Sequence, residues 1–198
     1  DIQVSRLKLL KANHTSQIYR LQDNILKHYP KKISSTKELI AAYAVDIAHY
    51  REVKRADKDN FSMTLGDRTY TDKKEAGTAL IAFCRQVKTP NRPVQIGEYL
   101  GFKMNVVYDT FYHKFTLNLK GALTHSIEVG SDAFGNLTRI NNVLDGMEKS
   151  QAKEQELLAN TEKQLENAKE EVEKPFAQED ELNEKLERLA ELNALLNM

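Results

Sequence analysis

The last third of the chain carries the longest regular hydrophobic pattern in the sequence. From Leu137 to Val172, positions recur at alternating spacings of three and four, which is typical of a helix that packs along a second helix. The row comprises Leu137, Ile140, Leu144, Met147, Gln151, Glu154, Leu158, Thr161, Leu165, Ala168 and Val172. Gln151 and Glu154 interrupt it with polar side chains, so we expect weaker or wetter pairing there. The pattern predicts one helix of about 36 residues, roughly 54 Å long.

Pro175 predicts the end of this helix, because proline lacks an N–H and disfavours helical backbone in the residue before it. A second leucine row beyond it predicts another helix, which we expect to fold back on the first as a hairpin. Its members are Leu182, Leu186, Leu189, Leu192, Leu195 and Leu196. At the other end, Gly135–Asn136 is expected to cap the entry to the long helix.

The start of the chain predicts a second pair of helices. Residues 3–28 have one apolar stripe, in which His14 also lies, and Tyr29–Pro30 is expected to end that helix. Ser35 and Glu38 have the spacing of a capping box for a helix that reaches about Lys54. Two helices with such a short connection predict an antiparallel hairpin. The stripe of the first helix contains Val4, Leu7, Leu10, Ile18, Leu21 and Ile25.

The middle of the chain alternates with period two, which predicts strands with one buried face. The predicted strands are 61–65, 68–70, 96–106, 115–119 and 125–129, and within 96–106 the segment Ile96–Gly101 leads into the alternating stretch 102–106. A polar loop at 55–60 precedes them, and the segment 89–93 breaks them. A helix at 72–88, capped by Asp72 with Glu75, is expected to cover the sheet through Ala76, Leu80, Phe83 and Val87. Sequential strands with short turns indicate an antiparallel sheet.

These elements predict an α+β fold. A small antiparallel sheet head with a covering helix is inserted between two antiparallel helical hairpins, which form a coiled-coil-like stalk. The expected domains are 1–58 for the first hairpin, 59–130 for the head and 131–198 for the second hairpin. The sequence starts inside a helical pattern without a methionine, so we interpret it as a piece of a longer protein.

The net charge of zero conceals an asymmetry between the two ends of the chain. Residues 1–125 contain 21 basic and 12 acidic residues, whereas residues 126–198 contain 8 basic and 17 acidic residues. Either the basic part meets a polyanion, or it pairs with the acidic part of the same chain. A single cysteine, Cys84, favours a reducing cytosol, so a cytoplasmic location is expected. No apolar run approaches the roughly 20 residues of a membrane helix, so no membrane contact is expected.

Catalytic motifs are missing from the sequence. No glycine-rich phosphate loop or Cys/His metal spacing occurs, and the five histidines are scattered. Ser126 beside His125 lacks the glycine-flanked turn of a hydrolase nucleophile. We therefore expect no catalysis, no metal and no cofactor in this segment.

Three places suit nucleic-acid binding. The turn 108–114 gathers aromatic rings beside a lysine, and the alternative, which we favour, is a hairpin tip with one ring folded onto the core. An arginine and asparagines in the first turns of the long helix suit a phosphate, or else form a polar knot between head and helix. Scattered cations at the head edge add to these. The candidates are Arg68, Lys73, Lys74, Arg92, Tyr108, Tyr112, Lys114, Arg139 and Asn142.

Several short stretches together resemble one protein family. They are Leu9–His14, Tyr19–Leu21, Tyr29–Pro30, Tyr70–Gly77, Gly97–Tyr99, Gly101–Phe102, Leu119–Ala122, Gly135–Asn136 with Arg139 and Asn142, Lys174–Phe176 and Arg188–Asn193. Spread over nearly the full length, they resemble the C-terminal region of large helicase–methyltransferase fusion proteins of bacterial conjugative mobile elements. Those proteins join a Swi/Snf-type helicase to an adenine-specific DNA methyltransferase. The resemblance implies that the ATP and S-adenosylmethionine sites lie upstream of this segment.

Three functions follow as expectations. The first is a non-catalytic accessory module that helps such an enzyme bind or position DNA. The second is a protein-interaction or spacer module, which docks the upstream helicase or methyltransferase domains or forms a homodimer through its seam. The third, an enzyme in its own right, has the least support. A continuous positive stripe on the head would favour DNA, and a neutral head with an exposed apolar seam would favour a protein partner.

Overall fold

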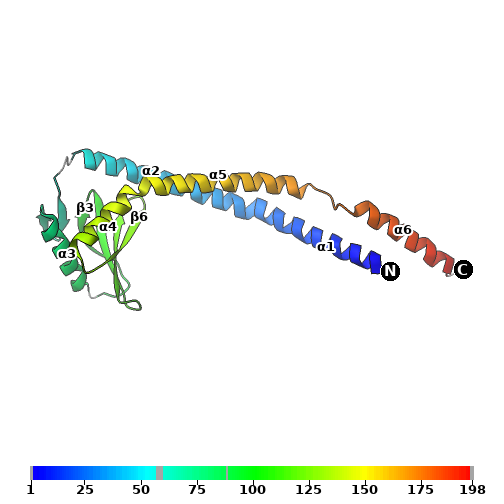
Figure 1. Ribbon diagram of the computed structural model, residues 1–198, viewed down its shortest axis with the longest axis horizontal. Helices are drawn as coiled ribbons and strands as arrows, with labels where there is room; N and C mark the ends of the chain where they lie inside the picture. Colours follow the sequence, from blue (N-terminus) through cyan, green and yellow to red (C-terminus); the bar gives the residue numbers. More distant parts are fainter. Residues whose placement is uncertain (1, 57–59, 88, 197–198) are drawn as a thin grey trace. The chain divides into compact units, whose positions relative to one another are not determined.

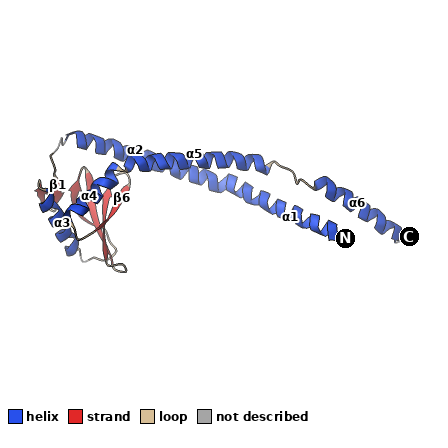
Figure 2. Ribbon diagram, in the orientation of Figure 1, coloured by secondary structure: helices blue, strands red, loops and turns tan. Residues whose placement is uncertain are grey.

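The computed structural model describes residues 2–56, 60–87 and 89–196, apart from the side chain of Leu196. The fold is α+β, as the sequence predicts, with helical segments before and after one antiparallel sheet (Figures 1 and 2). The helices are α1 (Ile2–Asp23), the π-helix η1 (Asn24–His28), α2 (Tyr29–Ala56), α3 (Lys73–Gln86), α4 (Ala133–Asp145), α5 (Met147–Val172) and α6 (Glu179–Leu196). The strands are β1 (Met63–Leu65), β2 (Arg68–Tyr70), β3 (Val94–Tyr99), β4 (Phe102–Asp109), β5 (Lys114–Lys120) and β6 (Thr124–Val129).

The chain divides into two compact units. The helical unit comprises Asp1–Thr36 and Glu156–Met198, and the head unit comprises Lys37–Gln155. The head unit therefore contains the predicted sheet together with the adjoining parts of the front and back helices. Asp57, Lys58 and Asp59 of the predicted polar loop lie outside the described residues, as do Lys88 and Met198. Among the described helices, none has both the length and the apolar character needed to cross a bilayer.

The sheet has six strands in the order β2-β1-β3-β4-β5-β6, and every neighbouring pair is antiparallel. Period-two alternation places one set of side chains in the core and the other on an open face. Phe102, Met104 and Val106 of β4 are fully buried. The helices α3 and α4 lie against this buried face (Figure 2), as expected for α3. The predicted cap of α3 is confirmed, because Asp72 Oδ1 accepts from the Glu75 N–H at 2.9 Å.

The front helix corrects the predicted N-terminal hairpin. Tyr29–Pro30 does not end a helix, because helical backbone continues through η1 into α2 as far as Ala56. A proline inside an α-helix removes one hydrogen bond and pushes against the carbonyl four residues earlier. Here that carbonyl belongs to Leu26 and lies in the π turn, where Tyr29 N–H donates to Asn24 O instead. The wider turn accommodates the proline, so helical backbone continues rather than stopping.

The predicted capping box at Ser35 is wrong for the same reason. Ser35 lies inside α2, and its hydroxyl donates to the Lys32 carbonyl one turn earlier, at 3.0 Å. Thr36 makes the equivalent bond to the same carbonyl at 2.8 Å. Serine and threonine compete for backbone partners wherever they occur, and this competition is compatible with a helix interior as well as with a cap.

The heptad row of the back helix is confirmed. None of its eleven positions from Leu137 to Val172 is exposed. The single predicted helix is divided into α4 and α5 at Gly146, whose N–H donates to Asn142 O. The predicted cap at Gly135–Asn136 is also displaced. Asp132 is the N-cap, and its carboxylate accepts from Gly135 N at 2.8 Å.

The helix after Pro175 does not fold back along α5, which corrects the predicted C-terminal hairpin. Within the helical unit, α6 instead packs antiparallel to α1. The Lys11 ammonium pairs with Glu179 at 2.5 Å, and the Lys185 ammonium donates to Gln3 Oε1 at 3.0 Å. Along α6, Leu182 is buried against this partner, while the last described leucines, Leu192 and Leu195, are exposed.

Candidate functional site

The β4–β5 turn presents an exposed aromatic pair on a fixed backbone. Asp109 Oδ1 accepts from the N–H groups of Phe111 and Tyr112 at 2.8 and 2.9 Å. Phe111 is 81% exposed and Tyr112 is 66% exposed, and their rings contact each other at a centroid distance of 4.8 Å. Tyr108 is different, because its ring packs on Phe115 at 4.7 Å at the edge of the core. The turn therefore contains one structural ring, as the hairpin-tip alternative required, and two rings available to a ligand.

Two predicted cations lie at the same end of the sheet as this turn. Lys114 forms an ion pair with Glu128 of β6 at 2.9 Å. The loop that carries Arg92 is joined to β4, because Asn91 N donates to Tyr108 O at 3.0 Å. The structure thus brings Arg92, Tyr112 and Lys114 to one end of the head, with the charge of Lys114 compensated internally.

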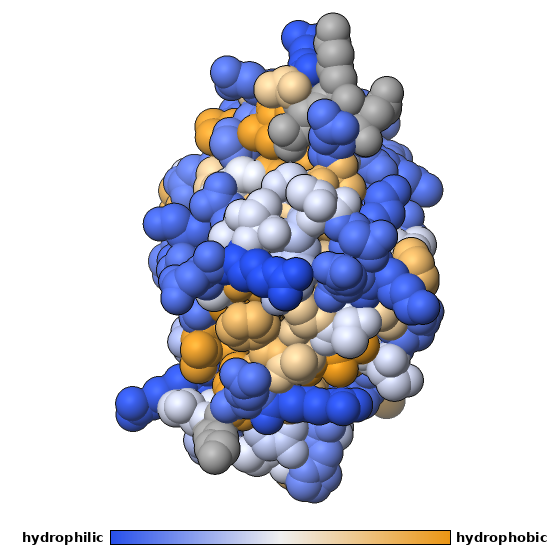
Figure 3. Space-filling view, turned by 90° about the vertical axis from the view of Figure 1, so that its left-hand side faces the viewer, coloured by the Kyte–Doolittle hydropathy of each residue, from blue (hydrophilic) through white to orange (hydrophobic). Residues whose placement is uncertain are grey.

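A second group surrounds the start of α3. Arg68 lies over the Tyr70 ring at 4.7 Å and 3.5 Å from the Glu75 carboxylate. Arg68 and Lys74 line a shallow groove of about 430 Å³ along α3, and Lys73 and Lys74 line a neighbouring hollow beside Phe134. Figure 3 views the side of the head unit where α3 and β1 lie. Hydrophilic side chains cover most of this face, with hydrophobic ones gathered mainly in its lower half.

Arg139 belongs to the polar knot that was the alternative to a phosphate site. Its guanidinium donates to Asn136 Oδ1 at 2.8 Å. Asn136 is fully buried and exchanges two hydrogen bonds with the backbone of Gly130, at 2.7 and 2.9 Å. Arg139 therefore holds the asparagine that ties the end of β6 to α4. Asn142 is exposed one turn further on and does not take part in the knot.

The nine candidate residues do not form one surface. The sheet register places the turn beyond Asp109 at one end of the sheet, whereas Tyr70 pairs with Met63, and Met63 with Tyr99, towards the other end. Residues 37–155 contain 17 basic and 15 acidic residues, so the head is close to neutral. Of the two interpretations of the charge asymmetry, pairing within the chain has direct examples. Front-to-back ion pairs are Lys11–Glu179, Arg51–Glu148 and Lys54–Asp145.

A buried carboxylate–histidine pair was missed by the sequence analysis. Asp46 of α2 accepts from the N–H groups of Ala122 and Leu123, at 2.6 and 2.9 Å, and lies 2.9 Å from His125 Nε2. The two side chains are only 2% and 5% exposed. No ligand reaches them, so the pair anchors α2 to the β5–β6 turn instead of acting on a substrate. The sequence feature that could have indicated this pair is Asp46, an aspartate next to Ile47 in an otherwise apolar stripe of the helix.

A second polar cluster joins α2 to α4 in the head unit. Tyr50 OH donates to Asp145 Oδ1 at 2.7 Å, and the Lys54 ammonium donates to the same oxygen at 2.8 Å. The hydrogen bond from Lys54 lowers the pKa of the Asp145 carboxyl, and that bond to Asp145 raises the pKa of Lys54. Burial raises the pKa of the neighbouring Tyr99 phenol to about 12. At neutral pH the cluster is a fixed ion pair with neutral phenols and offers no group that titrates near pH 7.

Among the described residues, neither a reactive thiol nor a cluster of metal ligands is found. Burial raises the pKa of the Cys84 thiol to about 11, and its side chain is 1% exposed. The thiol therefore stays protonated and shielded. No cluster of three or more metal-ligating side chains occurs among the described residues.

The helical unit presents a surface that the sequence analysis missed. The inner row of α1 and η1 consists of Val4, Leu7, Lys11, His14, Ile18, Leu21 and Ile25, none of which is exposed. A second heptad row, here called the outer row, consists of Ile2, Ser5, Leu9, Ala12, Ser16, Tyr19, Asp23 and Leu26, all of them exposed. Its four large apolar members, Ile2, Leu9, Tyr19 and Leu26, are 87, 63, 67 and 74% exposed. A count of every third and fourth residue would have found this row.

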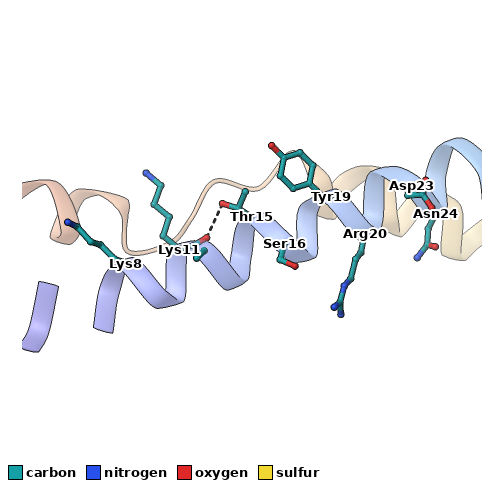
Figure 4. Close-up of a pocket in the computed structure, with 9 residues that line it drawn as sticks. Lys8, Lys11, Thr15, Ser16, Tyr19, Arg20, Asp23 and Asn24 are labelled. Atoms are coloured by element: carbon teal, nitrogen blue, oxygen red, sulfur yellow. Dashed lines mark hydrogen bonds between the residues drawn. The ribbon is translucent and has the colours of Figure 1, made fainter. Parts of the chain in front are cut away.

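A shallow groove of about 880 Å³ follows the outer row. Ala12, Ser16 and Tyr19 line it together with the cations Lys8, Lys11 and Arg20. Figure 4 shows Lys11, Thr15 and Tyr19 directed to one side of α1, and Ser16 and Arg20 to the other. Small side chains between exposed rings and aliphatic groups allow a partner backbone to approach closely.

Comparison of the chain with protein-family models, with curated proteins and with solved structures returned no match.

Proposed function

We propose that this chain is a non-catalytic protein-docking module, in which α1 binds a partner protein while its opposite face packs against α6. The observation that carries the proposal is the outer row of α1. Its four large apolar side chains share one face of the helix, with small or polar residues between them, and exposed apolar surface gathered on one face commonly marks an interaction site. The nearly neutral head, in which Arg68 and Lys114 are paired with carboxylates, favours a protein partner over a polyanion.

The arrangement of the helical unit supports this role. The chain already covers part of the inner row of α1. Helix α6 packs along the first turns, as the Lys11–Glu179 pair indicates, and Phe176, which precedes α6, contacts His14. The outer row differs from the inner row by two positions, or about 200° around a helix, so its centre faces away from α6, with Tyr19 nearest to the side of Lys11 (Figure 4). A helix with two apolar rows on opposite faces is suited to two partners at once.

The family resemblance supplies candidate partners, the helicase and methyltransferase domains of the fusion proteins. We expect one of these domains to bind the chain, and Leu9→Ala combined with Tyr19→Ala to weaken binding at least tenfold. Phe111→Ala combined with Tyr112→Ala, which removes a comparable pair of exposed apolar side chains from the head, is the control and should leave binding unchanged. Biolayer interferometry measures both. A chain that binds neither domain and sediments as a monomer at every concentration would contradict the proposal.

The exposed aromatic pair of the head favours a second function, the binding of single-stranded DNA. Phe111 and Tyr112 project beside Arg92 and Lys114, and aromatic side chains next to cations stack on unpaired bases. We expect retardation of a single-stranded oligonucleotide at low salt, which Phe111→Ala with Tyr112→Ala reduces about tenfold or more, since each stacked base contributes roughly 1–3 kcal/mol. Absence of retardation at low salt excludes this function. Leu9→Ala with Tyr19→Ala is the matched control.

A further inference from the structure

The side chains that border the outer row are mostly cationic. In the heptad register of Ile2, Leu9, Ser16 and Asp23, the flanking positions are Arg6, Asn13, Arg20 and Lys27 on one side and Lys8, Thr15 and Gln22 on the other. Flanking positions of a paired helix meet the flanking positions of its partner and set partner choice through their charges. The outer row is therefore an apolar strip between two borders with four cations.

Most of these cations are not neutralised within the described part of the chain. Lys27 pairs with Asp23, which is the one acidic member of the outer row. Arg6, Lys8 and Arg20 are exposed and form no ion pair with the described residues. Lys11 lies on the side towards α6, where Glu179 binds it. Three uncompensated cations along about four turns of helix repel a basic partner and attract an acidic one.

We infer that the outer row of α1 binds an acidic amphipathic helix of another protein, with apolar residues at heptad spacing and glutamate or aspartate on both sides. This inference rests on the proposed docking function and specifies the chemistry of its partner. The row extends from Ile2 to Leu26, about 36 Å at 1.5 Å per residue, which matches a partner helix of roughly seven turns. The chain itself provides a precedent, because basic α1 already binds α6, whose first turn contains Glu179, Asp180 and Glu181.

Pairing of two copies through α1 is disfavoured by the same charges. An outer row facing its own copy brings together flanking positions that hold four cations and no acidic side chain, so the cations gain no ion pair between the copies. Like charges at flanking positions of paired helices destabilise the pair. The acidic helix of a different protein meets these cations favourably, and this difference decides between the two occupants.

Two designed peptides test the inference on the full chain. Both are 28-residue helices with leucine at the two core heptad positions, and the flanking positions are all glutamate in one and all lysine in the other. Fluorescence anisotropy at low salt is expected to give at least tenfold tighter binding of the glutamate peptide. Leu9→Ala with Tyr19→Ala should weaken that binding at least tenfold, because the apolar contact is lost.

Charge-reversal variants distinguish an acidic partner from nonspecific hydrophobic binding. Lys8→Glu with Arg20→Glu should weaken binding of the glutamate peptide at least tenfold and strengthen binding of the lysine peptide. Lys149→Glu with Lys153→Glu, two exposed residues of α5, makes the same change in net charge elsewhere and should alter neither affinity by more than about twofold. Far-UV circular dichroism checks that every variant keeps its helix content.

The outcomes that overturn the inference are distinct. Equal binding of both peptides, or of neither, removes the role of the flanking cations. Concentration-dependent self-association that Leu9→Ala with Tyr19→Ala abolishes makes a second copy the occupant. Duplex DNA that binds the wild type but not the Lys8→Glu, Arg20→Glu variant makes a polyanion the occupant. If a helicase or methyltransferase domain binds through Leu9 and Tyr19 regardless of Lys8 and Arg20, the docking function stands and only the acidic partner is wrong.

Discussion

Asp46 shows how a single buried polar side chain holds α2 in one position against the sheet of the head. Asp46 satisfies two backbone N–H groups and His125 where α2 meets the β5–β6 turn. Its side chain is 2% exposed, so no water replaces a lost partner. A buried donor left without an acceptor costs about 1–3 kcal/mol. The pair is thus a structural lock, although its composition resembles that of a catalytic dyad.

Asp46→Asn should destabilise the head by about 2 kcal/mol or more, because the new amide group turns a donor towards groups that themselves donate. Urea denaturation followed by circular dichroism measures the change. Glu98→Gln makes the same chemical change on the exposed side of β3 and should stay within about 0.5 kcal/mol. Equal stabilities of the two variants would show that Asp46 is not the anchor.

Asp145 gives a pH-dependent prediction. Its folded-state pKa is lowered below the usual 3.8, first by the hydrogen bond from Lys54. A group with a depressed folded pKa contributes stability above its unfolded pKa, and this stability is lost as the pH falls through the folded pKa. Its side chain is 53% exposed, so the contribution is small, about 0.5 kcal/mol.

Asp145→Asn should therefore lower stability at pH 7 by that amount and make the loss of stability below about pH 4 less steep. Thermal melts between pH 2.5 and pH 7 compare the variant with the wild type. A wild type and a variant whose stabilities differ by the same amount at every pH would exclude an ionised Asp145 as the source.

At the scale of elements, close approach of strands depends on glycine at one position. A Cβ on Gly97 would lie 1.9 Å from the Thr64 carbonyl oxygen, which is far inside van der Waals contact. Gly97 also follows the bulge where the β3–β4 register shifts, and it pairs with Leu65 of β1. The short strand β1, and through it β2, therefore reaches the sheet only because this position has no side chain.

Gly97→Ala should destabilise the head by about 1–3 kcal/mol, the usual cost of forcing extra atoms into a packed site. Amide hydrogen exchange should show the greatest loss of protection in β1, since its backbone must move away. Gly135→Ala, where the contact is the flexible Asp132 carboxylate, is a milder comparison. Protection of β1 that survives Gly97→Ala would mean that the strands separate without cost.

The sequence predicted helices and strands well wherever a hydrophobic spacing repeated several times. The antiparallel sheet, the α3 cap at Asp72 and the heptad row from Leu137 to Val172 follow from alternation, capping chemistry and spacing. The stretch 96–106, predicted as one strand, is instead the hairpin of β3 and β4, because Leu100 and Gly101 take positive φ and reverse the chain.

The helix ends at prolines were less predictable. Pro30 is accommodated by a π turn, which no periodicity signals, and Pro175 ends a helix without reversing the chain. The direction that the chain takes after a helix ends depends on what the next helix packs against. For α6 that partner is α1, which is distant in sequence.

The candidate site was predicted less well than the fold. Tyr112 and Lys114 were correctly placed on a hairpin tip, but Arg139 proved to hold Asn136, and the cations of α3 lie towards another end of the head. Scattered surface charges have no period, so the sequence could not show which of them share a face. The outer row did have a period, but its small and polar members, Ser5, Ser16 and Asp23, concealed it.

At the scale of the whole molecule, the charge asymmetry between front and back helices is used in the same way within each unit. Basic front helices meet acidic back helices through Lys11–Glu179 in the helical unit and Lys54–Asp145 in the head unit. Each exposed pair contributes only up to about 1 kcal/mol, so the pairs select partners more than they stabilise them. By the same reasoning, the cations beside the outer row select a partner of opposite charge, which is why we infer an acidic partner for the docking function.

The docking function requires that α1 buries one face inside the chain and exposes the other to a partner. The most direct measurement compares thiol reactivity of Leu7→Cys on the inner row with Leu9→Cys on the outer row, in dilute solution. Cys84 contributes no background, because it is buried with a pKa raised to about 11. We predict that Leu9→Cys reacts with a thiol reagent nearly as fast as in urea, and that Leu7→Cys is strongly protected. Rapid reaction at both positions, or protection at both, would contradict the two-faced helix.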